Sequence, residues 1–151
     1  MKTTFNNLLQ TRENILKILE DNAGKEHIIP KGFNNSLYWN AAHCVVTQQL
    51  LCYKLSGNKI IIDDELVDLY KKGTKPLDTL PNIIEIGKVK DLLATSIEQM
   101  EKDYNEGLLK DYNAYPTSYG ITLKTISDAI LFNSIHEALH LGYMMAMVKN
   151  L

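Results

Sequence analysis

The chain has 151 residues, of which 45% are apolar and 23% charged, and its formal net charge is −2. This composition is typical of a globular protein long enough to bury one core, so we predict a single domain over residues 1–151. The small net charge argues against nucleic acid or an anionic membrane surface as the partner, and no apolar run approaches the roughly 20 residues that span a bilayer.

The first predicted element is a helix that Thr3 or Thr4 can cap and that ends near Asn22, with Gly24 suited to the turn that follows. Arg12 is placed off the centre of its apolar stripe. That stripe consists of Phe5, Leu8, Leu9, Ile15, Leu16 and Leu19. The residues before it lack the apolar core of a signal peptide, so we expect a cytoplasmic protein.

A loop with Pro30 and Gly32 precedes the second predicted helix, which begins after Asn35 or Ser36 and runs to about Leu55. Ser56-Gly57-Asn58 is a helix stop. The residues expected to point inward are Trp39, His43, Val46, Leu50 and Leu51.

The connection that follows, residues 57–81, is too long for a hairpin and contains a short helix capped by Asp63 or Asp64. The third long helix begins near Pro81, ends near Tyr104, and carries a second apolar stripe. Its members are Ile83, Ile86, Val89, Leu92, Leu93, Ile97 and Met100.

The fourth helix is predicted from Thr122 to Lys149, after a Tyr-rich loop that can cover one end of the helices. No strand is predicted. The long connection can cross the molecule, so the second and third helices can run parallel. We therefore predict an all-α fold, an up-down-down-up four-helix bundle with a long crossover between its second and third helices.

The last helix contains the motif His-Glu-x-x-His, from His136 to His140, which places two imidazoles on one helix face. The same motif occurs in zinc proteases, where the glutamate is the general base. Such proteases take a further ligand downstream, but no His, Asp or Glu follows His140, and no strand pattern precedes the motif. Glu137 is then expected behind the ligands or at the surface, and orienting a water is its candidate catalytic role.

His43 lies near the middle of the second helix, at a depth comparable with His136 and His140. Three histidines from two helices of one bundle can converge, and three imidazoles plus water form a catalytic metal arrangement. The alternative is a set of hydrogen-bonded core histidines. Imidazole ligands suit zinc or nickel. His27 lies in a loop and is expected at the surface.

Four polar or aromatic residues are candidates for substrate binding because they share a helix face with these histidines: Trp39, Asn40, Thr47 and Asn133. Trp39 is a pocket wall or a core anchor, Asn40 and Thr47 are donors to a ligand, and Asn133 holds a ligand or fixes an imidazole tautomer. Gly142 is expected to let another helix approach closely.

Two stretches resemble the DinB-like family: Tyr38-Trp39-Asn40-Ala41-Ala42-His43, and the segment from His136 through His140 to Tyr143. The resemblance implies an up-down-down-up four-helix bundle whose divalent metal is bound by His43, His136 and His140. It also implies a homodimer and a thiol-dependent enzyme that uses a low-molecular-weight thiol. Because a divalent ion on three imidazoles can also activate water, the predicted function is a metal-dependent enzyme of the thiol S-transferase or hydrolase class. The alternative function is a non-enzymatic dimeric module that binds metal or a small ligand.

Overall fold

The structure is a computed structural model that describes residues 1–76 and 81–151. Almost all regular structure in these residues is helical, which confirms the predicted all-α class. The α-helices are α1 (Lys2–Asp21), α2 (Leu37–Gln48), α3 (Asp64–Tyr70), α4 (Ile83–Asn105) and α5 (Ile126–Val148).

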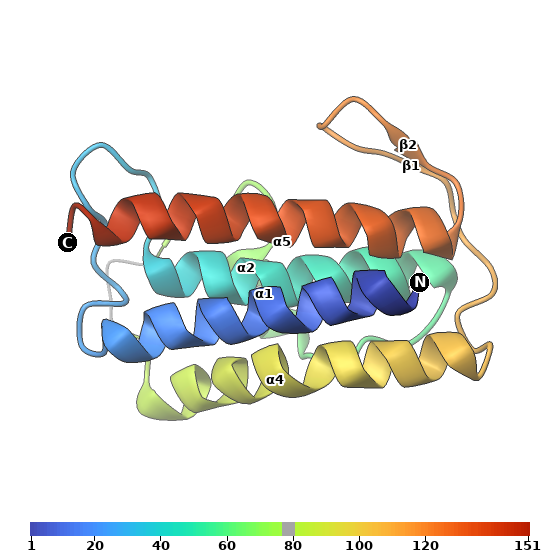
Figure 1. Cartoon of the computed structure of the whole chain (residues 1–151), viewed down its shortest axis with the longest axis horizontal. Helices are drawn as coiled ribbons and strands as arrows, with labels where there is room; N and C mark the ends of the chain where they lie inside the picture. The colour runs from blue at the N-terminus through green and yellow to red at the C-terminus, as the bar shows by residue number, and fades with distance from the viewer. Residues whose placement is uncertain (77–80) are drawn as a thin grey trace.

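Figure 1 shows the four long helices side by side, with α2 and α4 running in one direction and α1 and α5 in the other. Contacts join α1 to α4 and α5, and α2 to the same two helices. The short helix α3 lies in the connection between α2 and α4. Residues 77–80 of that predicted connection lie outside the described residues.

Helix α1 begins at Lys2, and no side chain caps it, so the predicted cap at Thr3 or Thr4 is wrong. Its buried residues are Phe5, Leu8, Arg12, Ile15 and Leu19. Arg12 therefore occupies the middle of the buried stripe, and the prediction that placed it off centre is wrong. The helical period places residue 12 on the buried face regardless of its side chain. The carboxylate that compensates the charge of Arg12 comes from a distant part of the sequence.

Helix α2 begins as predicted, because the Ser36 hydroxyl accepts a hydrogen bond from the Trp39 amide. The helical path continues through a π-helical segment, η1 (Gln49–Tyr53), and a 3₁₀ segment, η2 (Lys54–Ser56). It ends at Gly57, whose φ of 74° is left-handed. The predicted extent to about Leu55 is confirmed, whereas the departure from α-helical geometry has no sequence signal that we recognised.

Helices α3 and α4 begin at Asx caps. The Asp63 side chain accepts from the Leu66 amide, and Asn82 accepts from the Glu85 amide. The predicted start of α4 is displaced, because Pro81 precedes the cap and is not part of the first turn. Ile83, which the sequence assigns to the apolar stripe, is 84% exposed because it lies in the first turn, beyond the packed part of α4.

Helix α5 begins at Ile126, not Thr122. Thr125 and Asp128 form a capping box that fixes this start. The residues before it form the strand β2 (Thr122–Leu123), which pairs antiparallel with β1 (Tyr115–Pro116). The prediction of no strand is therefore wrong for this hairpin, which projects beside the start of α5 in Figure 1.

Gly142 is predicted to receive a close helix, but nothing in the described chain lies within 4 Å of the position where its Cβ would be. That prediction is wrong within one chain, because Gly142 is on the exposed side of α5. Among the helices of the described ranges, none has the length and apolar character needed to cross a bilayer.

The core consists of two apolar clusters with a polar layer between them along the helices. One cluster includes Ile15, Val46, Leu93 and Met144, and the other includes Leu8, Leu51, Ile97 and Ile130. The buried polar residues of the layer are Arg12, Gln48, Gln49, Ser96, Asn133 and Glu137.

An ion pair between Arg12 and Glu137 lies at the centre of this polar layer. Arg12 Nε lies 2.6 Å from Glu137 Oε2, and Nη2 lies 2.8 Å from Oε1, with both side chains at most 1% exposed. Nη2 also donates to the Cys44 carbonyl at 3.2 Å. Burial lowers the pKa of Arg12, but the charge and hydrogen bond of Glu137 produce a net rise, so the guanidinium stays charged.

Removing one partner would leave a buried charge without compensation. We expect Arg12→Met to lower the free energy of unfolding by about 3–5 kcal/mol. The double variant Arg12→Met/Glu137→Leu should recover most of that loss, because both charges are gone. Urea denaturation measures both, with Lys17→Met, on an exposed lysine of α1, as the control. A double variant no more stable than Arg12→Met would contradict the assignment.

Candidate metal centre

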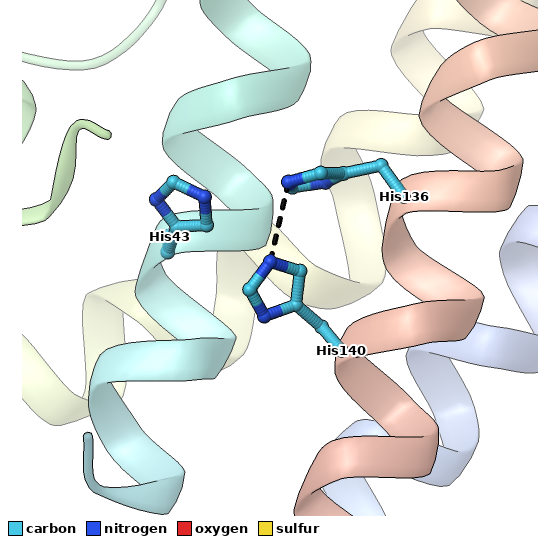
Figure 2. A group of neighbouring side chains, drawn as sticks. All are labelled: His43, His136 and His140. Atoms are coloured by element: carbon cyan, nitrogen blue, oxygen red, sulfur yellow. Dashed lines mark hydrogen bonds between the residues drawn. The ribbon is translucent and has the colours of Figure 1, made fainter. Parts of the chain in front are cut away.

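Three imidazoles converge between α2 and α5. Figure 2 shows His43 projecting from α2 toward His136 and His140, which project from successive turns of α5. One ring nitrogen from each lies within 4.8 Å of the others. His136 Nε2 and His140 Nε2 are 3.2 Å apart, and a tetrahedral ion with Zn–N bonds near 2.0–2.1 Å separates two ligand nitrogens by about 3.3 Å. The spacing of this pair suits a shared ion.

His43 is held by the connection between α2 and α4. Its Nδ1 lies 2.6 Å from the carbonyl oxygen of Tyr70, an acceptor that fixes the proton on Nδ1 and leaves Nε2 unprotonated. The Trp39 ring stacks on the imidazole, with centroids 4.7 Å apart and planes at 10°. Trp39 Nε1 donates to Thr74 Oγ1. Trp39 therefore positions the imidazole from behind.

His140 is oriented by Asn40. Its Nδ1 lies 2.8 Å from Asn40 Oδ1, and the Asn40 amide nitrogen donates to the Ser36 carbonyl. The amide orientation makes Oδ1 the acceptor and so places the His140 proton on Nδ1. The sequence predicts Asn40 as a donor to a bound ligand, but in the structure its donor group faces Ser36 and its oxygen faces His140.

His136 completes the group without such a partner. Its Nδ1 is buried and has no hydrogen bond within the described chain, while its Nε2 faces His140 Nε2. Because His140 carries its proton on Nδ1, His136 donates its Nε2 proton to His140 Nε2 when no ion is bound. In the other neutral tautomer of His136 both Nε2 lone pairs face one position at a spacing that suits a shared ion, so the donor set fits a metal ion.

The electrostatics of the group favour neutral imidazoles. Burial, with the neighbouring imidazoles adding to it, lowers the pKa of His136 to about 2 and that of His140 to about 4. Burial also lowers the pKa of His43. Near neutral pH all three side chains therefore present lone pairs, which is the form that binds a metal ion.

Glu137 and Asn133 lie away from this group. The Glu137 oxygens both accept from Arg12, and Asn133 Nδ2 donates to Glu137 Oε1 at 2.7 Å. Glu137 is fully buried, so its predicted surface position is wrong. Asn133, predicted to hold a ligand or fix a tautomer, instead supports Glu137.

A cavity of about 450 Å³ opens beside His43 and His136, and we call it the histidine cavity. Thr47 lines this cavity, and its Oγ1 lies 3.2 Å from His43 Nε2. This position agrees with its predicted role as a substrate contact. Tyr115 of the β1–β2 hairpin and Phe132 of α5 form other walls. Of the predicted binding residues, Thr47 is the one that reaches this space, while Trp39, Asn40 and Asn133 pack behind the imidazoles or the ion pair.

Sequence reasoning missed the residues that orient the site from a distance. Tyr70 acts through its backbone carbonyl, which carries no side-chain signal. Arg12 did leave a signal, because a charge at the helical period of an apolar stripe calls for a buried partner. That partner, Glu137, is 125 residues away, and only the fold brings the two together.

The sequence matches the DinB superfamily over residues 7–144, a range that includes all three histidines. The match confirms the resemblance inferred from the two helix motifs. Among curated protein sequences, none matches this chain.

The lowered pKa values predict a pH dependence of the metal-free protein. Unfolded histidines, with a pKa near 6.5, take up protons that folded His136 and His140 do not bind. Stability should therefore be complete above about pH 6.5 and decline as the pH falls toward about 4. Urea midpoints in the presence of a chelator test this. The variant His136→Asn/His140→Asn should lose most of this slope; an equal slope in both proteins would contradict it.

Proposed function

The chain belongs to the DinB superfamily, and we propose that it is a metal-dependent enzyme whose divalent ion is held by His43, His136 and His140. The observation that carries the proposal is the convergence of three neutral imidazoles, two of which, His43 and His136, line a cavity large enough for a small molecule. Zinc and nickel both suit imidazole ligands. The spacing of the imidazoles supports a site for such an ion.

A divalent ion on three neutral ligands keeps its full charge and lowers the pKa of a water or thiol bound to it. The chain's own residues prepare this position. The Tyr70 carbonyl and Asn40 keep the protons of His43 and His140 on Nδ1, so that Nε2 is free. The Thr47 hydroxyl, next to His43 Nε2, can hydrogen-bond a group bound there.

The reaction classes that fit are thiol S-transfer and hydrolysis. No carboxylate lines the histidine cavity within the described ranges, and Glu137 is committed to Arg12. The proposal therefore assigns no protein general base, and Glu137 is not retained as a catalytic residue. The low-molecular-weight thiol expected from the family resemblance would be the nucleophile in the transferase case.

A non-enzymatic module that binds metal or a small ligand is the second candidate function. It is favoured by the lining of the histidine cavity, which includes no carboxylate among the described residues that could act as a general base. The two candidates share the metal site and differ in turnover.

Metal content tests the ligand set. We expect the wild-type protein to retain about one equivalent of zinc or nickel, and His43→Ala, His136→Ala and His140→Ala each to weaken binding more than about tenfold. His27→Ala, at the histidine outside the cluster, is the matched control and should bind as the wild type does. Unchanged metal content in His43→Ala would contradict the assignment of His43 as a ligand.

Turnover separates the two functions. The metal-loaded protein is assayed with a panel of low-molecular-weight thiols and an electrophilic dye, and with ester and amide substrates. Activity that is lost in His43→Ala but kept in His27→Ala supports the enzyme. Bound metal without turnover across the panel favours the binding module.

We also propose that residues 1–151 form one up-down-down-up four-helix bundle domain with a long crossover. The helix directions in Figure 1 and the contacts of both α1 and α2 with α4 and α5 support this topology. A cytoplasmic location belongs to the same proposal. It is supported by Cys44 and Cys52, which are buried free thiols whose pKa values burial raises, as expected in a reducing compartment.

We propose a homodimer formed through the outer face of α5. This face exposes five large apolar side chains: Leu131, Ile135, Leu139, Tyr143 and Met145. Between Asp128 and Lys149 the only Asp, Glu, Lys or Arg is Glu137, which is buried. An uncharged apolar face is complementary to itself, as a twofold interface requires.

The proposed dimer would cover one side of the candidate metal centre. A cavity of about 260 Å³ lined by Leu139, His140 and Tyr143 opens on the same face, so a second copy seated there would cover the outer side of His140. The open space at Gly142 suits the close approach of a partner helix.

Leu139→Glu places a charge in the centre of this face and should convert the dimer into a monomer. Light scattering during gel filtration measures the mass. Leu108→Glu is the matched control, because Leu108 is equally exposed but lies after α4, away from this face. A wild-type monomer, or a dimer that survives Leu139→Glu, would reject the interface.

A further inference from the structure

The histidine cavity is lined by two lysines. Lys54 and Lys72 both line it, and they come from different elements of the chain. No Asp or Glu lines the cavity in the part of the chain that the structure describes. A cavity with two lysines and no carboxylate attracts anions.

Lys54 belongs to the same helical face as the metal-site residues. His43, Thr47, Leu50, Leu51 and Lys54 follow one another at helical spacing along α2, η1 and η2, and all of them line the cavity. The helix therefore presents an imidazole, a hydroxyl, two leucines and an ammonium group in that order. The ammonium group lies at the end of the helix path that is remote from the imidazole.

Lys72 is placed by the segment that orients His43. It follows Tyr70, whose carbonyl accepts from His43 Nδ1, by two residues. Its neighbour Lys71 makes an ion pair with Asp68, 2.6 Å away, whereas Lys72 lines the cavity. Lys71 therefore pairs with a carboxylate at the protein surface, whereas the adjacent Lys72 lines the cavity.

The remaining walls combine apolar surface with hydroxyl groups. Leu50, Leu55 and Phe132 supply the apolar part, and Tyr115, Thr117 and Ser118 of the hairpin segment contribute hydroxyls. Apolar walls bind the body of a small molecule, and the few polar groups fix its orientation.

We propose that the histidine cavity binds an amphipathic small-molecule anion, with its charged group paired with Lys54 or Lys72 and its apolar body against the leucines and Phe132. His43 and His136 line the same cavity, so the bound molecule lies beside the candidate metal site. Binding of the anion stands on the cavity alone, and its role as the substrate rests on the proposed function. A carboxylate and a phosphate share the chemistry that these lysines recognise.

The test compares an acid with its neutral amide, using 4-phenylbutyrate and 4-phenylbutyramide as probes in calorimetric titrations. Lys54→Gln/Lys72→Gln should weaken binding of the acid about fivefold and leave the amide unchanged, because two partly exposed charge contacts are lost. Phenyl phosphate as a third probe shows whether phosphate is accepted as well as carboxylate.

The matched control is Lys17→Gln/Lys149→Gln, which removes the same net charge from lysines that do not line the cavity. It should change affinity for the acid less than about twofold. Titrations are made with both zinc-loaded and chelator-treated protein, because a carboxylate can also bind the ion directly. The lysine effect should persist in the metal-free protein.

If both double variants lost the same affinity for the acid, the effect would be one of net charge and the proposal would be overturned. Equal affinities of the wild-type protein for the acid and the amide would overturn it as well. These outcomes are independent of the metal site. A protein that binds no metal but still discriminates acid from amide through Lys54 and Lys72 would refute the proposed enzyme and support the anion site.

Discussion

The buried ion pair between Arg12 and Glu137 is the constraint on which the arrangement of this molecule depends. Two charges without water must find each other at hydrogen-bond distance, so α1 and α5 are held in a single relative register. The bond from Arg12 to the Cys44 carbonyl extends this restraint to α2. A purely apolar contact between the same helices would tolerate rotation and sliding far better, because apolar packing is not directional.

This restraint reaches the candidate metal centre through the geometry of α5. Glu137 is adjacent to His136, and successive helical residues are rotated by about 100°. Turning Glu137 toward Arg12 therefore sets the directions of His136 and His140, which face α2. We infer that the ion pair contributes orientation rather than net stability, since buried pairs seldom outweigh their desolvation cost. The polar layer that separates the two apolar clusters lies at the same level along the helices as the imidazoles, since Glu137 adjoins His136.

The connection between α2 and α4 has a second role besides linking the two helices. Its Tyr70 carbonyl holds His43, Thr74 accepts from the Trp39 indole, and Lys72 reaches the histidine cavity. The β1–β2 hairpin contributes Tyr115 to the wall of the same cavity. Two segments outside the long helices thus supply much of the surroundings of the imidazoles, which is common where a rigid scaffold supports a functional site.

Local and periodic features were accessible from the sequence. The long helices, the cap at Ser36, the stop at Gly57 and the three histidines follow from patterns that span at most a few turns, so the chain itself displays them. Pairings between remote segments were not accessible. Arg12 with Glu137, His43 with the Tyr70 carbonyl and His140 with Asn40 each depend on how helices are rotated against one another.

The same division explains the errors. The last helix is predicted to begin at Thr122, yet strand pairing of Thr122 with Pro116 and the cap at Thr125 move its start to Ile126. From the sequence alone, Glu137 is a carboxylate of a catalytic motif and is free to orient a water. In the fold, the Arg12 guanidinium lies beside it and takes both of its oxygens. The sequence by itself determined which residues could bind a metal ion. The tertiary structure decided which nitrogen of each ring faces the others and which polar groups are already committed, because those depend on contacts between helices distant in the chain.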